Sequence, residues 1–264
     1  MRTARRLLVV ALLIPVLITS LCYAQYTGGS DPLAISLAKR FVTQSSGAVT
    51  VGSYLASANV TRWNGGESTI ATGSMQGMGY FQSRIDMQFS SGVTSEIRGV
   101  TSTGLPSGAW TDGSGTHQVS YWNTAVGTHW YFPLLSSIAR YSDSTLTFNY
   151  VGQETWNGAN TLHIRVTTIV VQPTQHAPGA TSVTDYYLDP QSFLLLGMAS
   201  TLHSDAGSPS SVPWEVHYSR YENLNGVIVP AHIEEYVNGT LSRSIDVTSL
   251  EVNPVIPAAN FPVQ

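Results

Sequence analysis

The chain is organised around residues 186–251, which begin YYLDPQSFLLL and end HIEEYVNGTLSRSIDVTSLE. Asn238-Gly239 stands between two runs of alternating apolar and polar residues. This dipeptide is the strongest short-range signal of a β-hairpin, because both residues tolerate positive φ. Asp189-Pro190 and residues 223–226 mark two further turns. The stretch therefore predicts a meander of four antiparallel strands.

Residues 1–24 have the composition of a secretory signal peptide. A basic segment, residues 2–6, precedes an apolar run, residues 7–21, and Ala24 offers a small residue at a cleavage site. We expect export to the periplasm or the extracellular space after cleavage behind Ala24. A membrane anchor and twin-arginine export are alternatives that we rank lower.

Cys22 is the only cysteine of the chain. Acylation of Cys22 would tether the protein to a membrane, but we favour simple cleavage, because Leu21 is bulky where a lipoprotein signal has a small residue. Cleavage leaves residues 25–264 without cysteine, which excludes disulfides and thiolate metal sites. We expect these residues to form a single domain, because about 240 residues can bury a sizeable core.

The charge balance excludes a nucleic-acid partner. The formal net charge is −4, and it becomes −7 once Arg2, Arg5 and Arg6 are removed with the signal peptide. No basic stripe remains to contact phosphates. Only 11% of the residues are charged, and this composition is typical of an all-β protein outside the cytoplasm. We expect a monomer.

Asp31-Pro32 opens one predicted helix. Aspartate caps free N–H groups, and proline is favoured at the first helical position. Leu33, Leu37 and Phe41 recur at a spacing of four and form an apolar stripe, and Gly47 is a plausible end. Such a helix requires an apolar partner surface, most simply one face of a sheet.

Strand patterns fill most of the remaining chain. Residues 80–89 alternate most clearly, with Phe81, Ile85, Met87 and Phe89 on one face. Residues 105–115 are rich in Gly, Pro and Ser and predict a loop around Trp110. Residues after Pro133 have near-helical apolar spacing and predict a second, short helix. About ten strands in all favour a mainly β fold of the α+β type: a strongly curved antiparallel sheet that forms an incomplete barrel, with helices covering its concave face.

Over residues 31–262 a helix precedes a long run of strands, and the chain contains these motifs: Tyr187-Leu188-Asp189-Pro190, Tyr218-x-x-Tyr221, Asn225-Gly226-Val227-Ile228-Val229-Pro230, Val252-Asn253 and Phe261-Pro262. This layout and these motifs give the chain a resemblance to the LolA/LolB-like lipoprotein-carrier superfamily, which includes many secreted bacterial proteins. The resemblance implies an incomplete barrel around an apolar cavity closed by helices, with acyl chains as ligands.

Two His/Glu pairs lie at strand spacing i, i+2: Glu215 with His217, and His232 with Glu234. Such pairs can present two metal ligands side by side. A solvated sheet face explains them more simply, because no third ligand is visible. His163 shares its face with Arg165. We therefore predict no metal site and no cofactor.

No catalytic motif is visible in the chain. Ser114 lies in Asp112-Gly113-Ser114-Gly115, which lacks the spacing of a nucleophile elbow. Asp112 near Trp110 has the residue types of a glycosidase cleft, but no second carboxylate is placed beside it. We predict a protein without enzymatic activity. A hydrolase acting on envelope polysaccharide or lipid is an alternative.

The aromatic and aliphatic residues point to an apolar site. Their placement between sheet and helices favours a cavity for an apolar small molecule, a lipid or an acyl chain, in a carrier-like protein. The alternative is an envelope or interaction module whose core is filled by its own side chains. The predicted lining residues are Leu37, Phe41, Phe81, Ile85, Met87, Phe89, Trp122, Trp130 and Phe132.

Overall fold

The computed structural model describes residues 29–170, 180–205 and 210–263. The predicted signal peptide lies outside these residues. In the described residues, no helix has both the length and the apolar character needed to cross a membrane.

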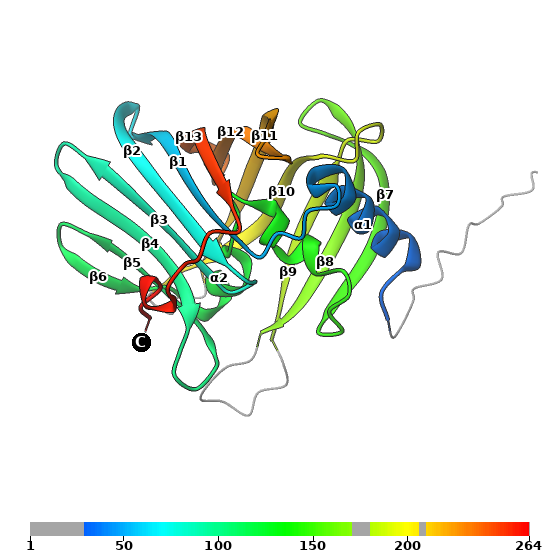
Figure 1. The fold of residues 1–264 in the computed structure, drawn as a ribbon, viewed down its shortest axis with the longest axis horizontal. Coiled ribbons are helices and arrows are strands. Elements are labelled where there is room, and N and C mark those ends of the chain that lie inside the picture. Colours follow the sequence, from blue (N-terminus) through cyan, green and yellow to red (C-terminus); the bar gives the residue numbers. More distant parts are fainter. Residues whose placement is uncertain (1–28, 171–179, 206–209, 264) are drawn as a thin grey trace, which may run out of the picture.

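Thirteen strands of the described chain form one antiparallel sheet, shown in Figure 1. They are β1 (Ser53–Asn64), β2 (Glu67–Met78), β3 (Gln82–Phe89), β4 (Gly92–Val100), β5 (Pro106–Asp112), β6 (Gly115–Gln118), β7 (Leu146–Trp156), β8 (Ala159–Val170), β9 (Ala180–Leu188), β10 (Leu195–His203), β11 (Ser211–Leu224), β12 (Val227–Val237) and β13 (Thr240–Val252). The order is β6-β5-β4-β3-β2-β1-β13-β12-β11-β10-β9-β8-β7, so all neighbours are consecutive except β1 and β13.

The turns between strands depend on residues that accept positive φ. Asn238 and Gly239 have φ of 52° and 72°, and Asn225 and Gly226 have φ of 53° and 84°, so both predicted turns are confirmed. The side chain of Asp189 accepts hydrogen bonds from the following backbone at Gln191 and Ser192. The prediction of four strands in this stretch was wrong by one: residues 186–188 end β9, and the chain from there to Val252 contains β10, β11, β12 and β13, which makes five strands.

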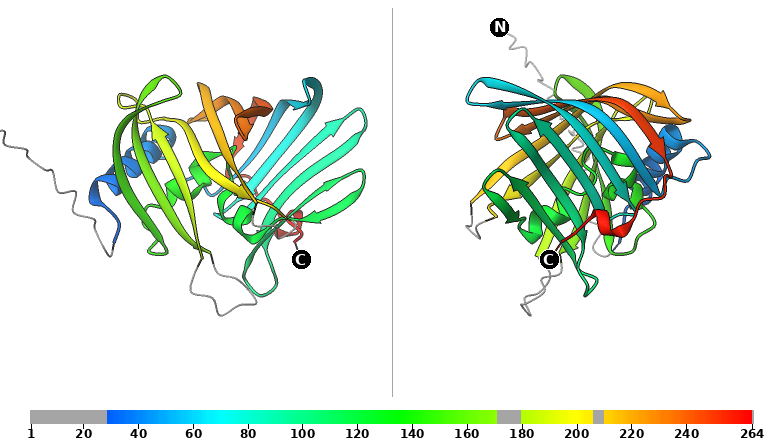
Figure 2. Two further views of the ribbon diagram at one scale, coloured as in Figure 1. Left: turned by 180° about the vertical axis from the view of Figure 1, so that it is seen from behind. Right: turned by 60° about the vertical axis from the view of Figure 1, so that its left-hand side comes forward.

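The sheet curves strongly and does not close, since β6 and β7 remain as separate edges. Figure 2 shows the strands wrapping around the helical segments, which lie on the concave side. These segments are α1 (Pro32–Ser46), α2 (Tyr121–Val126) and the short 3-10 helices η1 (Pro133–Leu135) and η2 (Ser137–Arg140); a third 3-10 helix, η3 (Ala258–Asn260), is near the C-terminal end. The predicted fold class is confirmed.

Helix α1 begins as expected. The Asp31 carboxylate accepts a hydrogen bond from Leu33 N at 2.8 Å, and Gly47 ends the helix with φ of 56°. The helix packs on β7, β12, η1 and η2. Its buried apolar residues are Ala34, Leu37, Ala38 and Phe41. Helix α2 contacts β5 and also β8, β9 and β10, so it bridges strands that lie far apart in the sheet order.

Three further predictions about elements were wrong. The loop expected over residues 105–115 contains β5 and the start of β6. The helix expected after Pro133 is a pair of 3-10 helices, and the α-helix of this region, α2, precedes it. The strand expected from Tyr80 begins at Gln82, which leaves Phe81 in the turn before it and 38% exposed.

Candidate functional site

A cavity of about 320 Å³ opens on the concave side of the sheet. Its walls come from β1, from β3 to β5, from β10 to β13, and from α2 with the segment after it. This volume is at the lower end of the range for small-molecule sites, about 300–1,000 Å³. The cavity lies between the two arms of the curved sheet, not beneath α1.

Strand register explains why charged side chains reach this face. Glu96 pairs with Ile85, and residues paired in an antiparallel sheet point to the same side. Ile85 is fully buried in the core, so Glu96 faces the concave side with it. Glu235 alternates with the buried Ile233, and Arg243 pairs with Glu235. Both therefore face the cavity as well.

Arg243 connects the two arms of the sheet. Its Nη1 lies 2.7 Å from Glu96 Oε1, and its Nε lies 2.9 Å from Glu235 Oε2. Three strands, β3, β2 and β1, separate β4 from β13 in the sheet order. The Arg243–Glu96 ion pair therefore crosses the concave space and exists only because the sheet curves.

Burial and charge compete at this cluster. Burial lowers the pKa of Arg243, but the carboxylates of Glu235 and Glu96 outweigh it and raise that pKa above its ordinary value. Burial raises the pKa of Glu96, yet Arg243, Arg98 and Arg62 outweigh it and leave that pKa lowered. Both groups are therefore charged at neutral pH.

Two tryptophans form much of the apolar wall. Trp130 and Trp214 meet edge to face, with ring centroids 6.1 Å apart. The Arg243 guanidinium lies 4.9 Å from the centre of the Trp130 ring, and Trp214 Nε1 donates to Glu235 Oε1 at 2.9 Å. Met87 and Leu202 complete this wall. The cavity thus has an apolar side beside a charged one.

Arg98 also lines the cavity, on the same face of β4 as Glu96. Its Nη1 donates to the backbone oxygen of Ile97 at 3.1 Å, and its Nε is buried without a hydrogen-bond partner among the described residues. A Cβ atom at Gly108 would lie 2.8 Å from Arg98 Cδ, and one at Gly127 would lie 3.3 Å from Nη2. Because Gly108 and Gly127 have no Cβ atom, the Arg98 side chain fits between them and the cavity.

The rim carries polar side chains that hold α2 in place. Asp205 accepts from Ser120 N at 2.7 Å and from Asn123 Nδ2 at 3.1 Å, and Trp110 Nε1 lies 3.3 Å away. Asn123 also donates to the backbone oxygen of His203 at 2.6 Å. These contacts tie α2 to the end of β10.

Asp112, Ser114 and His117 lie together in the hairpin between β5 and β6. Ser114 Oγ is 2.6 Å from Asp112 Oδ1 and 3.2 Å from His117 Nε2, while that same nitrogen is 3.3 Å from Asp112. In a catalytic triad the acid and the nucleophile bind opposite nitrogens of the imidazole. Hydrogen bonds from Ser114 lower the pKa of Asp112 to about 2. This arrangement is that of a capped turn.

The nine residues predicted to line one cavity lie in different parts of the structure. Met87 and Trp130 line the cavity. Phe41 and Phe132 border a void of only about 10 Å³ beneath α1. The space between α1 and the sheet is therefore filled by side chains. Three others, Leu37, Ile85 and Phe89, are buried in the core. Trp122 is half-buried, and the centroid of its ring lies 5.1 Å from that of the His203 ring. Phe81 is exposed, and the centre of its ring lies 4.7 Å from the Arg140 guanidinium.

Sequence reasoning missed Glu96, Arg98, Trp214, Glu235 and Arg243 as site residues. The available signal was a charged side chain in phase with buried apolar ones, as for Glu235 after Ile233 and Arg243 before Ile245. A charge at an inward position either finds a partner or marks a site.

The two His/Glu pairs lie on the outer face of the sheet. His217 and Glu234 are register partners, so the pairs are neighbours. His217 Nε2 lies 3.1 Å from Glu215, and His232 lies 3.6 Å from Glu234 and 2.9 Å from Asp246. Within the described ranges no group of three or more His, Cys, Asp or Glu has the arrangement of a metal site.

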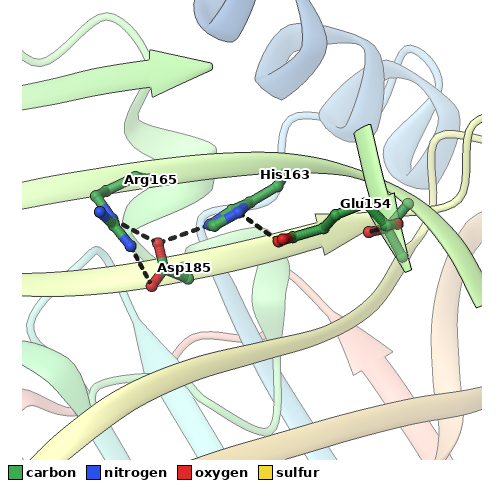
Figure 3. A network of polar contacts seen from close by, with 5 residues as sticks. Glu154, His163, Arg165 and Asp185 are labelled. Carbon is green, nitrogen blue, oxygen red and sulfur yellow. Dashed lines mark hydrogen bonds and ion pairs between the residues drawn. The ribbon is translucent and has the colours of Figure 1, made fainter. Parts of the chain in front are cut away.

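His163 belongs to a second outer-face network, shown in Figure 3. Its Nε2 lies 2.7 Å from Asp185 Oδ1, and its Nδ1 lies 2.6 Å from Glu154 Oε1. Asp185 also accepts two hydrogen bonds from Arg165, at 2.8 and 3.1 Å. The network connects β7, β8 and β9 on the side away from the cavity, which indicates a role in strand pairing.

Comparison with known proteins gives a match at the level of fold. No protein-family model matches the chain, and no curated protein sequence matches it. Among solved structures, a domain assigned to outer membrane lipoprotein sorting from Vibrio parahaemolyticus has a TM-score of 0.52 at 14% identity, over 87% of this chain and 96% of that one. A DUF1329 family protein from Desulfovibrio piger has a TM-score of 0.54 at 13% identity, over 89% and 98%.

A LolA superfamily protein from Nitrosomonas europaea is also similar, with a TM-score of 0.49 at 8% identity, over 87% of this chain and 97% of that one. At such identities, likeness concerns the fold alone. The curved open sheet, the helices on its concave face and the two neighbours from Vibrio parahaemolyticus and Desulfovibrio piger together show that this chain has the fold expected from the resemblance, an open curved sheet of the lipoprotein-sorting type.

Proposed function

We propose that this protein is a non-catalytic, carrier-like protein that holds the apolar part of a lipid or acyl chain in the cavity between the arms of the sheet. The cavity of about 320 Å³, with its wall of Trp130, Trp214, Met87 and Leu202, is the observation that carries the proposal. Apolar walls with a few convergent polar groups are characteristic of small-molecule sites.

The fold supports this proposal. One neighbour of similar fold is assigned to outer membrane lipoprotein sorting, a task that requires a protein to shield acyl chains from water. The signal-peptide pattern of residues 1–24 supports export to the periplasm or the extracellular space. We further propose that the protein acts as a monomer, not tethered through Cys22.

The alternative of an interaction module with a filled core has one observation in its favour. The space beneath α1, where the sequence predicted the ligand, is reduced to about 10 Å³. An apolar ligand therefore has room in the cavity between the arms, but not under α1. The two functions differ in whether the purified protein contains or takes up a lipid.

Mass spectrometry of an organic extract from the purified full chain tests the proposal first. A lipid-free sample is then titrated with a fatty acid or lipid probe, and tryptophan fluorescence reports binding because Trp110, Trp130 and Trp214 line the cavity. We expect a change in fluorescence that saturates. A protein that is empty after purification and takes up no probe would show the proposal to be wrong.

A variant locates the ligand. Leu202→Trp places a large ring in the cavity and is expected to weaken probe binding by about tenfold or more, since a filled site excludes the ligand. Ile70→Trp is the matched control, because Ile70 is 76% exposed and lies outside the cavity lining. Equal binding by both variants would place the ligand elsewhere.

A further inference from the structure

We infer that Arg98 binds an anionic group of the ligand, so the cavity selects amphiphiles with a carboxylate or phosphate head over neutral ones. This inference rests on the proposed function. It concerns the charged side of the cavity, whereas the proposed function concerns the apolar side.

The carboxylates around the cavity already have partners in the described protein. Arg243 holds Glu96 and Glu235, as described above. Asp205 accepts from the backbone at the start of α2 and from Asn123. Asp112 accepts from Ser114. Two buried polar atoms of this lining have no hydrogen-bond partner among the described residues, Arg98 Nε and Thr94 Oγ1. Both can donate a hydrogen bond, so an acceptor from a ligand would satisfy them.

Arg98 is the charged residue of the cavity with a buried N–H that lacks a hydrogen-bond acceptor among the described residues. A guanidinium has five N–H donors. Within the described residues, Arg98 makes one hydrogen bond, to its neighbour's backbone at Ile97, and no ion pair within 4.0 Å. A buried donor without a partner costs free energy and calls for an explanation, such as a bound ligand. Burial lowers the pKa of Arg98, yet arginine remains charged at neutral pH.

The other cations at the cavity are less suited to this role. Arg243 is bound to two carboxylates. Arg62 also lines the cavity, but it is exposed to solvent, which weakens its attraction for an anion. Arg98 combines burial with free donors. Gly108 and Gly127 leave room for its side chain and limit where it can lie.

Two neighbouring carboxylates reduce the attraction of Arg98 for an anionic head group. Glu96 and Asp205 act on Arg98 through space, so they oppose an incoming anion. A charge-assisted hydrogen bond of ordinary strength still gives a preference of about tenfold or more over a neutral head. An amphiphile can contact Arg98 with its head while its chain covers the apolar wall, because both line one cavity.

The experiment compares ligands of equal chain length by tryptophan fluorescence and calorimetry on the full chain. The ligands are hexadecanoate, hexadecyl phosphate and the neutral hexadecanol. We expect the wild type to bind at least one anionic ligand about tenfold or more tightly than hexadecanol. The two anions distinguish a carboxylate head from a phosphate head.

Variants assign the preference to Arg98. Arg98→Gln is expected to bring the affinity for the anionic ligands down to that for hexadecanol, while Arg98→Lys retains part of the preference. Arg165→Gln is the control, because Arg165 lies on the outer face, paired with Asp185. Circular dichroism checks the fold of each variant.

The outcomes separate the two proposals. A wild type that binds no amphiphile contradicts the proposed function itself. A wild type that binds hexadecanol as tightly as both anions contradicts the inference alone, whatever the variants do. Equal loss of all three ligands in Arg98→Gln assigns a structural role to Arg98 and also overturns the inference.

Discussion

His129 is a residue whose burial should make the stability of the whole protein depend on pH. It is fully buried beside Tyr54, with a ring nitrogen 3.4 Å from the Tyr54 hydroxyl, and its Nε2 has no hydrogen-bond partner among the described residues. Burial lowers the pKa of His129 from 6.5 to about 3. Between pH 6.5 and about pH 3, His129 therefore binds a proton in the unfolded chain and does not bind one in the folded chain.

We predict that this group reduces the free energy of unfolding as pH falls below about 6.5, by about 1.4 kcal/mol per pH unit, and that the loss ends near pH 3. His129→Asn removes the titrating group and suits the backbone, because asparagine tolerates the φ of 57° found here. Urea denaturation at about pH 7 and about pH 5 measures the change. The variant should lose about 2 kcal/mol less than the wild type over this interval.

His232→Asn is the matched control, since His232 is half-exposed on the outer face. A His129→Asn protein that keeps the full pH dependence of the wild type would contradict the prediction. The comparison uses the difference between two pH values, so any loss of stability common to both pH values cancels.

At the residue scale, the sequence predicted the face of the sheet on which a residue lies better than whether the residue lines the cavity. Alternation correctly placed His217 and His232 on the outer face and Met87 on the inner one. It did not identify Arg243 as a cavity residue, because its partner Glu96 lies 147 positions away in the chain and comes close only through the curvature of the sheet. Arg98 was missed because the facing strands that enclose it are also distant in the chain. Phe81 was misplaced because the strand begins at Gln82, two residues after the predicted start at Tyr80.

At the scale of elements, β2 shows how small residues make room for the helical segments. Its inward positions include Ala71, Gly73, Met75 and Gly77. A Cβ atom at Gly77 would lie 2.6 Å from atoms of both His129 and Tyr54. We predict that Gly77→Ala destabilises the protein by about 1–3 kcal/mol through this overlap, as measured by chemical denaturation.

Gly52→Ala provides the control for this prediction. A Cβ atom there meets only Asn253 Oδ1, at an ordinary 3.7 Å. Its effect should stay within about 0.5 kcal/mol. If Gly77→Ala is as stable as Gly52→Ala, the close packing of β2 against the segment after α2 is not required.

The elements that the sequence predicted correctly have local causes. Asp31-Pro32 started α1, and Asn-Gly turns ended several strands, because these signals act within a few residues. β5 was mistaken for a loop because of its glycine content. Gly108 is needed there to admit the Arg98 side chain, which is a tertiary requirement. Pro133 starts a 3-10 turn. The apolar residues after Pro133 have near-helical spacing because they are buried against α1, and not because they form an α-helix.

At the scale of the whole molecule, consecutive hairpins predicted most of the sheet order. The pairing of β1 with β13 and the depth of the cavity were not predictable in this way. Both depend on contacts between residues about two hundred positions apart, and on twist summed over thirteen strands. The ligand was therefore expected under α1, whereas the space is between the arms of the sheet.

The segment after β13 crosses to the outer face of the opposite arm and secures the strands that carry Arg98. Asn260 accepts from Arg84 Nη1 at 3.1 Å and donates to Gln76 at 2.9 Å, so it binds both β3 and β2. Phe261 is buried, and its backbone oxygen would lie 2.7 Å from a Cβ atom at Gly99 of β4. Figure 1 shows this segment in red beside these strands.

We predict that Phe261→Ala lowers the free energy of unfolding by about 3 kcal/mol, because a buried aromatic side chain leaves a void. One continuous sheet should unfold in one transition, so the loss should appear as a single shifted midpoint in guanidinium. Val255→Ala in the same segment is the control; Val255 is 98% exposed and its loss should change stability by less than about 0.5 kcal/mol. A second, separate transition in Phe261→Ala would instead show that the arm with β2 to β6 unfolds independently, and that the segment stabilises this arm alone.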